Sequence, residues 1–302
     1  MATHVSFGAI GTLWKVDIED TLSFEKEREL FDCIHQKIDL FDLAYSRFRE
    51  DSWVSMLSRN IGTFDMPDNH AYVLLSLYKD LYLRTDGCMT PFIGQMLVDA
   101  GYDREYSLIK KKELVSPPAW EDVCEYTETQ ITMKQKTLLD FGAIGKGYLV
   151  DIVSHIIESF GITDYCVDAG GDMRHRNKNG ELLSVGLEHP DDITSVIGVV
   201  DIGNTSIAGS AGNRRRWGNF THIIDAQLRV SPEHIRAVWA ISKEAYIADA
   251  LHRNTVTLII LSYISINNLY FDHRHSPHLT SIGMKSEASE HNISLMHYKT
   301  TP

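Results

Sequence analysis

The order of helical and strand-like segments predicts an α+β fold, a domain of mixed sheets with packed helices. Apolar residues recur at helical spacing in the first third of the chain, and short segments rich in β-branched residues follow one another over residues 182–242. A mixed stretch over residues 138–176 separates these regions. Helices early and strands late, without strict alternation, are typical of α+β proteins.

The first predicted elements are a strand pair and two helices. Residues 6–18 mix β-branched and apolar residues around two glycines, which indicates a strand or a hairpin. Residues 24–45 carry an apolar stripe at helical spacing and predict an amphipathic helix. Asp68 or Asn69 can cap a second helix that ends near Leu83.

The middle of the chain predicts a strand, a helix and a second strand. Residues 137–140 indicate a short strand, and an amphipathic helix follows from Tyr148 to a glycine at the helix end, Gly161. Residues 165–169 form the next apolar strand. Asp151 lies inside the helix, where a carboxylate can pair with a nearby basic group.

Composition limits the classes of function. The chain has 302 residues, of which 43% are hydrophobic and 23% charged, and its net charge is −12. This profile predicts a soluble globular protein that does not bind nucleic acid nonspecifically or dock on anionic membranes. The N-terminus has no signal-peptide pattern, and the apolar residues 256–266 are too few to span a bilayer. Four cysteines without C-x-x-C spacing favour reduced thiols in a cytoplasmic protein.

Two glycine clusters flank the central helix, one around Lys146 and one before Asp172. Free N–H groups at a helix N-terminus, together with a lysine, suit a phosphate group. The spacing matches neither the P-loop pattern nor the dinucleotide pattern G-x-G-x-x-G. A phosphate site and a glycine turn that only packs a strand on a helix therefore both stay open. The glycines are Gly142, Gly145, Gly147, Gly170 and Gly171.

The segment "LDFGAIGKGYLVD" followed by "DAGGD" resembles the central motif of the ApbE family of flavin transferases. Other blocks resemble further motifs of this family in the same order along the chain. These are "GAIGTLWKV", "YSRFREDSWVSMLSRN", "DGCMTPFIGQMLVDAGYD", "SIAGSAGNRRRW", "THIIDAQ" and "YIADAL". The resemblance implies an ApbE-like domain over residues 1–251 and leaves residues 252–302 as a divergent tail of unknown fold.

This resemblance implies an FAD:protein FMN transferase. Such enzymes bind FAD and Mg²⁺, transfer FMN to a threonine hydroxyl of a target flavoprotein and release AMP, a reaction that depends on positioning and electrostatics. The implied partners are FAD and a flavoprotein with an acceptor threonine. Three alternatives stay open: an FAD pyrophosphatase, a flavin-binding protein with impaired catalysis, and an unrelated phosphate-binding α+β enzyme.

The resemblance also implies roles for single residues. The backbone carbonyl of Gly145 and the carboxylate of Asp249 would lie on the metal side, in keeping with the oxygen ligands that Mg²⁺ prefers. His222, with Asp225 near it, would take the proton of the attacking hydroxyl. The residues implied to bind the cofactor are Gly142, Lys146, Gly147, Asp168, Gly170, Gly171, Asp172, Ser210 and Arg215.

Each role has a structural alternative. An aspartate such as Asp249 near a helix N-terminus can serve the helix dipole alone. Residues 170–172 can form an ordinary β-turn, because glycine and aspartate are typical turn residues. His222 can be a structural residue of an apolar strand, and residues 214–216 can be a solvated basic loop.

Several positions depart from the family's pattern. Gly209 and Ala211 replace a threonine and a glycine of the family's turn, while Thr221 and Ala226 replace a histidine and a proline. These departures fall in the segments that the resemblance places near the flavin and the reaction centre.

A further departure concerns the metal side. Arg253 stands where the family has a threonine, one helical turn after Asp249, so its guanidinium is expected to pair with that carboxylate and weaken metal binding. Beyond Leu251 the resemblance ends. A metal site in the tail is a weaker alternative, because the spacing of its histidines is not that of paired ligands. These histidines are His273, His275 and His278.

Overall fold

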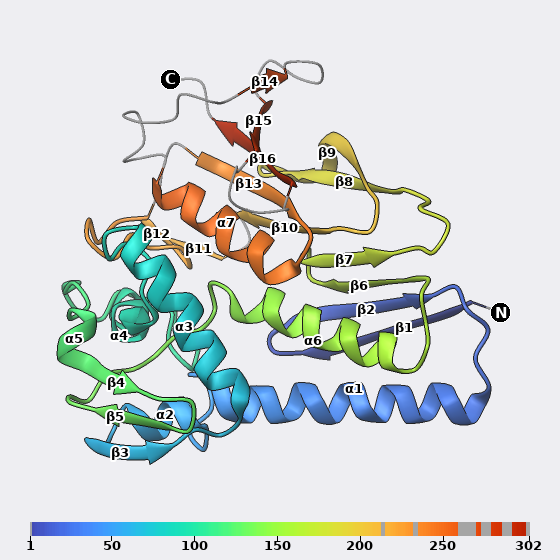
Figure 1. The fold of residues 1–302 in the computed structure, drawn as a ribbon. Helices are drawn as coiled ribbons and strands as arrows, with labels where there is room; N and C mark the ends of the chain where they lie inside the picture. Colours follow the sequence, from blue (N-terminus) through green and yellow to red (C-terminus); the bar gives the residue numbers. More distant parts are fainter. Residues whose placement is uncertain are drawn as a thin grey trace. The chain divides into compact units, whose positions relative to one another are not determined.

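The computed structural model describes residues 2–212, 215–231, 235–258, 270–272, 279–285 and 292–299. It confirms the α+β class, with helices and several antiparallel sheets (Figure 1). The chain forms two compact units. Unit 1 comprises Met1–Ile38, Ala143–Arg214 and Glu233–Pro302, and unit 2 comprises Asp39–Gly142 and Arg215–Pro232. Unit 1 thus includes residues on both sides of position 251, and the predicted domain boundary there stays a prediction.

Unit 1 is built on a large antiparallel sheet. Among the described residues the strand order is β1-β2-β6-β7-β10-β13-β16-β15-β14, and every neighbouring pair is antiparallel. The strands are β1 (Thr3–Ala9), β2 (Thr12–Ile18), β6 (Tyr165–Ala169), β7 (Met173–Arg176), β10 (Ser206–Ala211), β13 (Ile235–Ser242), β14 (Tyr270–Asp272), β15 (Leu279–Lys285) and β16 (Asn292–Lys299).

Helices α6 (Gly145–Ser159) and α7 (Ala245–Leu258) pack on each other and on this sheet. Ala208 of β10 and Ala240 of β13 are register partners, and both pack against Ala248 of α7 without solvent exposure. Because alanine side chains are small, the backbone of α7 can lie close to β10 and β13 at this contact. A separate ribbon of β8 (Leu183–His189) and β9 (Asp192–Ile202) contributes apolar side chains to the core around Ile207 and Trp239.

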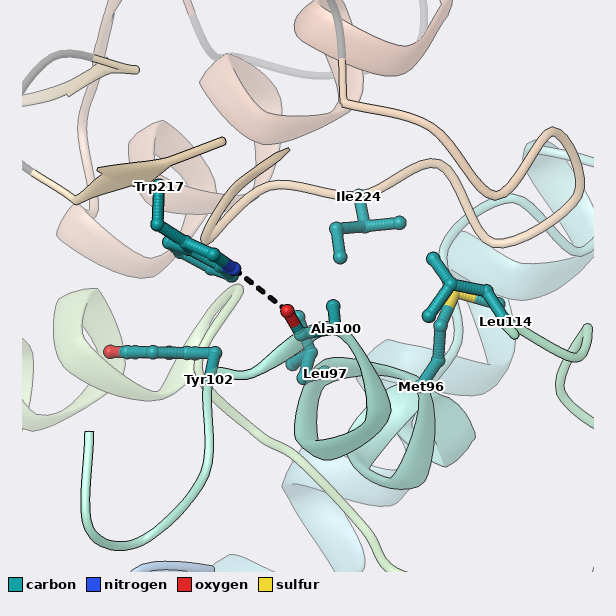
Figure 2. Packing of buried hydrophobic residues seen from close by; sticks show 7 residues of the cluster. All are labelled: Met96, Leu97, Ala100, Tyr102, Leu114, Trp217 and Ile224. Atoms are coloured by element: carbon teal, nitrogen blue, oxygen red, sulfur yellow. Dashed lines mark hydrogen bonds between the residues drawn. The ribbon is translucent and has the colours of Figure 1, made fainter. Parts of the chain in front are cut away.

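Among its described residues, unit 2 holds one long helix, α3 (Asn69–Arg84), several short helices and two small sheets. A core of Met96, Leu97, Ala100, Tyr102, Leu114, Trp217 and Ile224 brings its two chain segments together (Figure 2). The indole N–H of Trp217 donates to the Ala100 carbonyl at 2.7 Å and ties the later segment to the earlier one. The elements are α2 (Trp53–Leu57), β3 (Gly62–Asp65), α3 (Asn69–Arg84), η1 (Pro91–Ile93), α4 (Gly94–Ala100), α5 (Trp120–Val123), β4 (Cys124–Tyr126), β5 (Gln130–Met133), β11 (Arg216–Trp217) and β12 (Phe220–Thr221).

Most of the predicted elements are confirmed. The N-terminal segment is the β1–β2 hairpin, and α1 spans Phe24–Tyr45, the predicted amphipathic helix. Asp68 caps α3, since its carboxylate accepts from the N–H groups of His70 at 2.9 Å and Ala71 at 3.2 Å. The short late strands and the start of α7 are also present.

The strand predicted at residues 137–140 is wrong. The Asp140 N–H donates to the Pro91 carbonyl at 2.7 Å, and the Leu138 carbonyl lies against Gly94, where an added Cβ would come within 2.5 Å of it. The backbone of this segment therefore packs on and hydrogen-bonds to the turn that precedes α4, and these polar groups do not join a sheet. No helix of the described residues is long and apolar enough to cross a membrane.

The four cysteines are free thiols, and three of them are shielded. Burial raises the pKa of Cys88 to about 11 and the pKa values of Cys124 and Cys166 to about 12, whereas Cys33 is exposed. Thiolates are the reactive form, so at pH 8 we expect Cys33 to react with a disulfide reagent well before the other three. Thiol counting on the folded and the denatured protein checks this. Rapid reaction of several thiols in the folded protein would contradict the burial.

Candidate functional site

The N-terminus of α6 is the centre of the candidate site in unit 1. The helix forms because an apolar face, which includes Leu149, Val153 and Ile157, is fully buried, and it ends before Gly161, whose φ of +75° suits a helix C-terminus. Ile144 occupies the position just before the helix, and its side chain makes no capping hydrogen bond. The first N–H groups of a helix need acceptors from elsewhere.

The acceptor for the Gly147 N–H comes from α7. The Oδ2 atom of Asp249 accepts this hydrogen bond at 2.9 Å, and Asp249 has no solvent exposure. A Cβ at position 147 would lie 2.5 Å from the Ala245 carbonyl oxygen and 2.7 Å from the Asp249 Cβ. Glycine at this position therefore allows the two helices to approach closely, and the approach places a buried carboxylate beside the first turn of α6.

Lys146 forms an ion pair with Asp172 in the same unit. The Lys146 Nζ lies 3.0 Å from Oδ2 of Asp172, which is completely buried. The Oδ1 atom of Asp172 has no hydrogen-bond partner among the described residues. The lysine side chain keeps 23% of its surface exposed, so a positive group at the helix N-terminus stays accessible to solvent.

The second glycine cluster is a tight hairpin turn between β6 and β7. Gly170 and Gly171 have φ values of +64° and +100°, a pattern typical of type I′ turns. The Gly171 N–H donates to Oδ1 of Asp168 at 2.7 Å, and a Cβ at position 170 would collide with the hydroxyl of Thr12. The β-turn alternative is thus confirmed as the local structure, while contact with a flavin stays a prediction.

Asp151 pairs with a basic group, as predicted from its place inside the helix. Oδ1 of this α6 residue lies 2.5 Å from NH1 of Arg174 on β7, and both side chains are buried. Glu244, just before α7, also pairs with Arg174. Burial raises the pKa of Asp151, while hydrogen bonds from two backbone N–H groups and the Arg174 charge act in the opposite direction.

Ser210 lies on β10 opposite Val238 and is buried. The preceding Gly209 packs beneath Trp239, where a Cβ would come within 2.7 Å of the indole ring. Trp239 therefore occupies the space that the family's threonine side chain would need, which gives a physical reason for this departure.

In unit 2, Gly142 belongs to a turn organised by Asp140. Oδ1 of Asp140 accepts from the Gly142 N–H at 2.7 Å, and Oδ2 accepts from Nε of the buried Arg47. The guanidinium of Arg47 also lies over the rings of Phe48 at 4.1 Å and Tyr102 at 4.9 Å. Arg47 and Asp140 were not among the predicted site residues; the signal available for Arg47 was its position within the "YSRF" block.

Arg215 lies beside Tyr102 in unit 2. Its NH1 donates to the Tyr102 hydroxyl at 2.8 Å. Burial raises the pKa of Tyr102 to about 12, although the charge of Arg215 lowers it. Arg216 is exposed on β11, and Arg214 lies outside the described residues.

His222 and Asp225 lie in the segment after β12. Oδ1 of the buried Asp225 accepts from the N–H groups of Gln227 at 2.9 Å and Leu228 at 2.7 Å, so this carboxylate shapes a turn. His222 is half-buried. Thr221, which replaces a histidine of the family's motif, donates its hydroxyl to the Ile223 carbonyl at 3.0 Å. The catalytic roles of His222 and Asp225 stay predictions.

Among the described residues, no group of three histidine, cysteine, aspartate or glutamate side chains could hold a metal ion by itself. Mg²⁺ is commonly held by one or two carboxylates together with phosphate oxygens and water. The buried Asp249 carboxylate beside the start of α6 fits that kind of site. The backbone of Arg253 lies on α7, but its side chain is outside the described residues, as are His273, His275 and His278.

Comparisons with known proteins show which proteins the chain resembles. The chain is 25% identical over 260 residues to the FAD:protein FMN transferase of Escherichia coli K12, covering 80% of this chain and 74% of the relative. It is 24% identical over 265 residues to the enzyme of the same name from Vibrio cholerae, covering 82% and 79%. These relatives are transferases, and the chain is an enzyme of this class.

The profile of the ApbE family matches residues 10–260, and the chain belongs to this family. Solved structures share its fold. The ApbE protein of Thermotoga maritima gives a TM-score of 0.73 at 20% identity, covering 87% of this chain and 89% of that one. The flavin transferase ApbE of Vibrio cholerae gives 0.69 at 16% identity, covering 100% and 97%.

The contact between α6 and α7 predicts the effect of a single methyl group. Gly147→Ala should lower the free energy of unfolding by about 1–3 kcal/mol, because the added Cβ overlaps the Ala245 carbonyl and the Asp249 Cβ. Urea unfolding checks this, with Gly8→Ala as the matched control, since a Cβ at Gly8 meets nothing within 4 Å. Equal stability of the two variants would show that the helices are not in close contact at Gly147.

Proposed function

We propose that this protein is an FAD:protein FMN transferase that moves FMN from FAD to a threonine hydroxyl of a target flavoprotein, with Mg²⁺, and releases AMP. The observation that carries the proposal is the buried carboxylate of Asp249, which accepts from the Gly147 N–H in the first turn of α6, directly after the partly exposed Lys146. Family membership and the names of the relatives support the same activity.

The start of α6 suits the diphosphate of FAD. Its first N–H groups carry the positive end of the helix dipole, and Lys146 adds a full positive charge. Asp172 is buried beneath Lys146 and restrains the ammonium group, so less side-chain freedom is lost when a phosphate binds. The residues of the β6–β7 turn are proposed to lie beside the bound cofactor, with Ser210 and Arg215 as further contacts.

The metal side of the site is assigned to Asp249 and the backbone carbonyl of Gly145. Both are oxygen ligands of the kind that Mg²⁺ prefers. When bound, Mg²⁺ would neutralise charge on the phosphate oxygens and complete its coordination with them. The hydrogen bond from Gly147 to Oδ2 orients the Asp249 carboxylate, so the chain fixes this ligand before the substrate arrives.

The proposed reaction is a displacement at phosphorus. The oxygen of the acceptor hydroxyl attacks the phosphorus on the FMN side, the bond from this phosphorus to the bridging oxygen breaks, and AMP leaves. We propose His222 as the group that takes the hydroxyl proton, with Asp225 holding the turn that follows it. The free thiols of the chain support a reducing compartment, and we propose the cytoplasm.

The substitution Asp249→Asn tests the metal role, because it removes a charge with little change in shape. We expect Mg²⁺-dependent release of AMP from FAD to fall by about tenfold or more, and FAD affinity, followed by flavin fluorescence, to change much less. The acceptor in this assay is a threonine-containing fragment of a flavoprotein, and mass spectrometry detects the attached FMN.

Asp201→Asn is the matched control, since Asp201 is an exposed aspartate of unit 1 that pairs with Ser184. It should keep full activity. Equal loss of FAD binding and AMP release in Asp249→Asn would identify Asp249 as a structural residue only. AMP release without attached FMN would favour a pyrophosphatase instead of a transferase.

A further inference from the structure

We infer that Asp151 is a positioning residue that sets the place of the Asp249 carboxylate by holding the N-terminus of α7. The inference rests on the proposed function for the metal role of Asp249. That Asp151 holds α7, and with it Asp249, in place is inferred only from contacts within unit 1.

Both carboxylate oxygens of Asp151 contact the first residues of α7. Oδ1 accepts from the Ala245 N–H at 3.0 Å, and Oδ2 accepts from the Tyr246 N–H at 2.9 Å. Helix N-termini usually obtain such acceptors from the residue just before the helix. Here a side chain of α6, far away in the sequence, provides the cap, so the start of α7 is fixed to the body of α6.

A second contact lies one helical turn away on each helix. Gly147 precedes Asp151 by four residues on α6, and Asp249 follows Ala245 by four residues on α7. The Gly147 N–H donates to Asp249, while Asp151 accepts from the Ala245 N–H. The earlier residue of α6 thus contacts the later residue of α7, and the later residue of α6 contacts the earlier residue of α7. Two contacts one turn apart restrict both the sliding and the rotation of α7, and Asp249 moves with that helix.

Arg174 connects this junction to the sheet. Its guanidinium pairs with Asp151 at 2.5 Å, with Glu244 just before α7, and more distantly with Glu158 at 3.7 Å. The positive charge compensates the buried carboxylate of Asp151, which would otherwise be costly so far from water. With Glu244 and Glu158 still present, Arg174 keeps partners when Asp151 is neutralised, so we expect Asp151→Asn to fold.

The amide of Gly147 gives a readout that depends on neither metal nor substrate. Gly147 lies in the first turn of α6, where N–H groups have no acceptor within the helix, so its protection against hydrogen exchange reports the hydrogen bond to Asp249. In Asp151→Asn, the side-chain NH₂ group takes the place of Oδ2, and it cannot accept the hydrogen bond from the Tyr246 N–H. We expect the protection of Gly147, measured by NMR, to fall by about tenfold.

The same variant should need about tenfold more Mg²⁺ for half-maximal release of AMP from FAD, as is usual when a residue that orients a metal ligand is lost. Glu158→Gln is the matched control, because Glu158 also lies on α6 and pairs with Arg174 but does not contact the start of α7. It should leave both the Gly147 protection and the Mg²⁺ requirement unchanged. If Asp151→Asn does not fold, Asp151→Glu tests the same point, since it keeps the charge and displaces both oxygens by a methylene group.

Unchanged Gly147 protection in a folded Asp151 variant would overturn the inference, and so would lost protection with an unchanged Mg²⁺ requirement. An equal effect of Glu158→Gln would also overturn it, because the cause would then be the charge around Arg174. Wild-type protein that shows no Mg²⁺-dependent reaction would contradict the proposed function. In that case the Gly147 amide still decides whether Asp151 positions Asp249.

Discussion

The close approach of α6 and α7 at Gly147 is the constraint on which the candidate site of unit 1 depends. A side chain larger than hydrogen at this position would overlap the backbone of α7, and without close contact Asp249 would not reach the first turn of α6. Small residues also form the contact of α7 with the sheet, where Ala208 and Ala240 pack against Ala248. The packing of glycine and alanine residues around α7 thus determines where the buried Asp249 carboxylate lies.

Around this contact, buried charges are arranged so that each has a specific neighbour. Lys146 at the start of α6 pairs with the buried Asp172, and Arg174 on β7 pairs with Asp151 of α6. Burial of unpaired charges is costly, so these pairs are needed for a polar site inside a folded core. In a chain with a net charge of −12, the exposed part of Lys146 and the helix dipole are the positive groups that we propose to face the diphosphate.

Local sequence signals predicted most elements that carry the site. The apolar face of α6, the glycine at its end and the turn residues Gly170 and Gly171 each act over a few residues, so they are visible in the sequence. The strand predicted at residues 137–140 was wrong because its backbone groups are used by the turn at Pro91, a contact distant in sequence. The contacts of Asp151 with Arg174 and with the Ala245 N–H at the start of α7 are also distant in sequence. For this reason the sequence predicted a basic partner for Asp151 without identifying it, and it did not predict that Asp151 caps α7.

The most direct test of the metal assignment is a crystal structure of the protein with FAD and Mn²⁺, in which anomalous scattering locates the metal. We expect an anomalous peak at bonding distance from a carboxylate oxygen of Asp249 and from the Gly145 carbonyl, with phosphate oxygens completing the coordination. A peak bound to other side chains, with Asp249 retained only as the acceptor for Gly147, would contradict it.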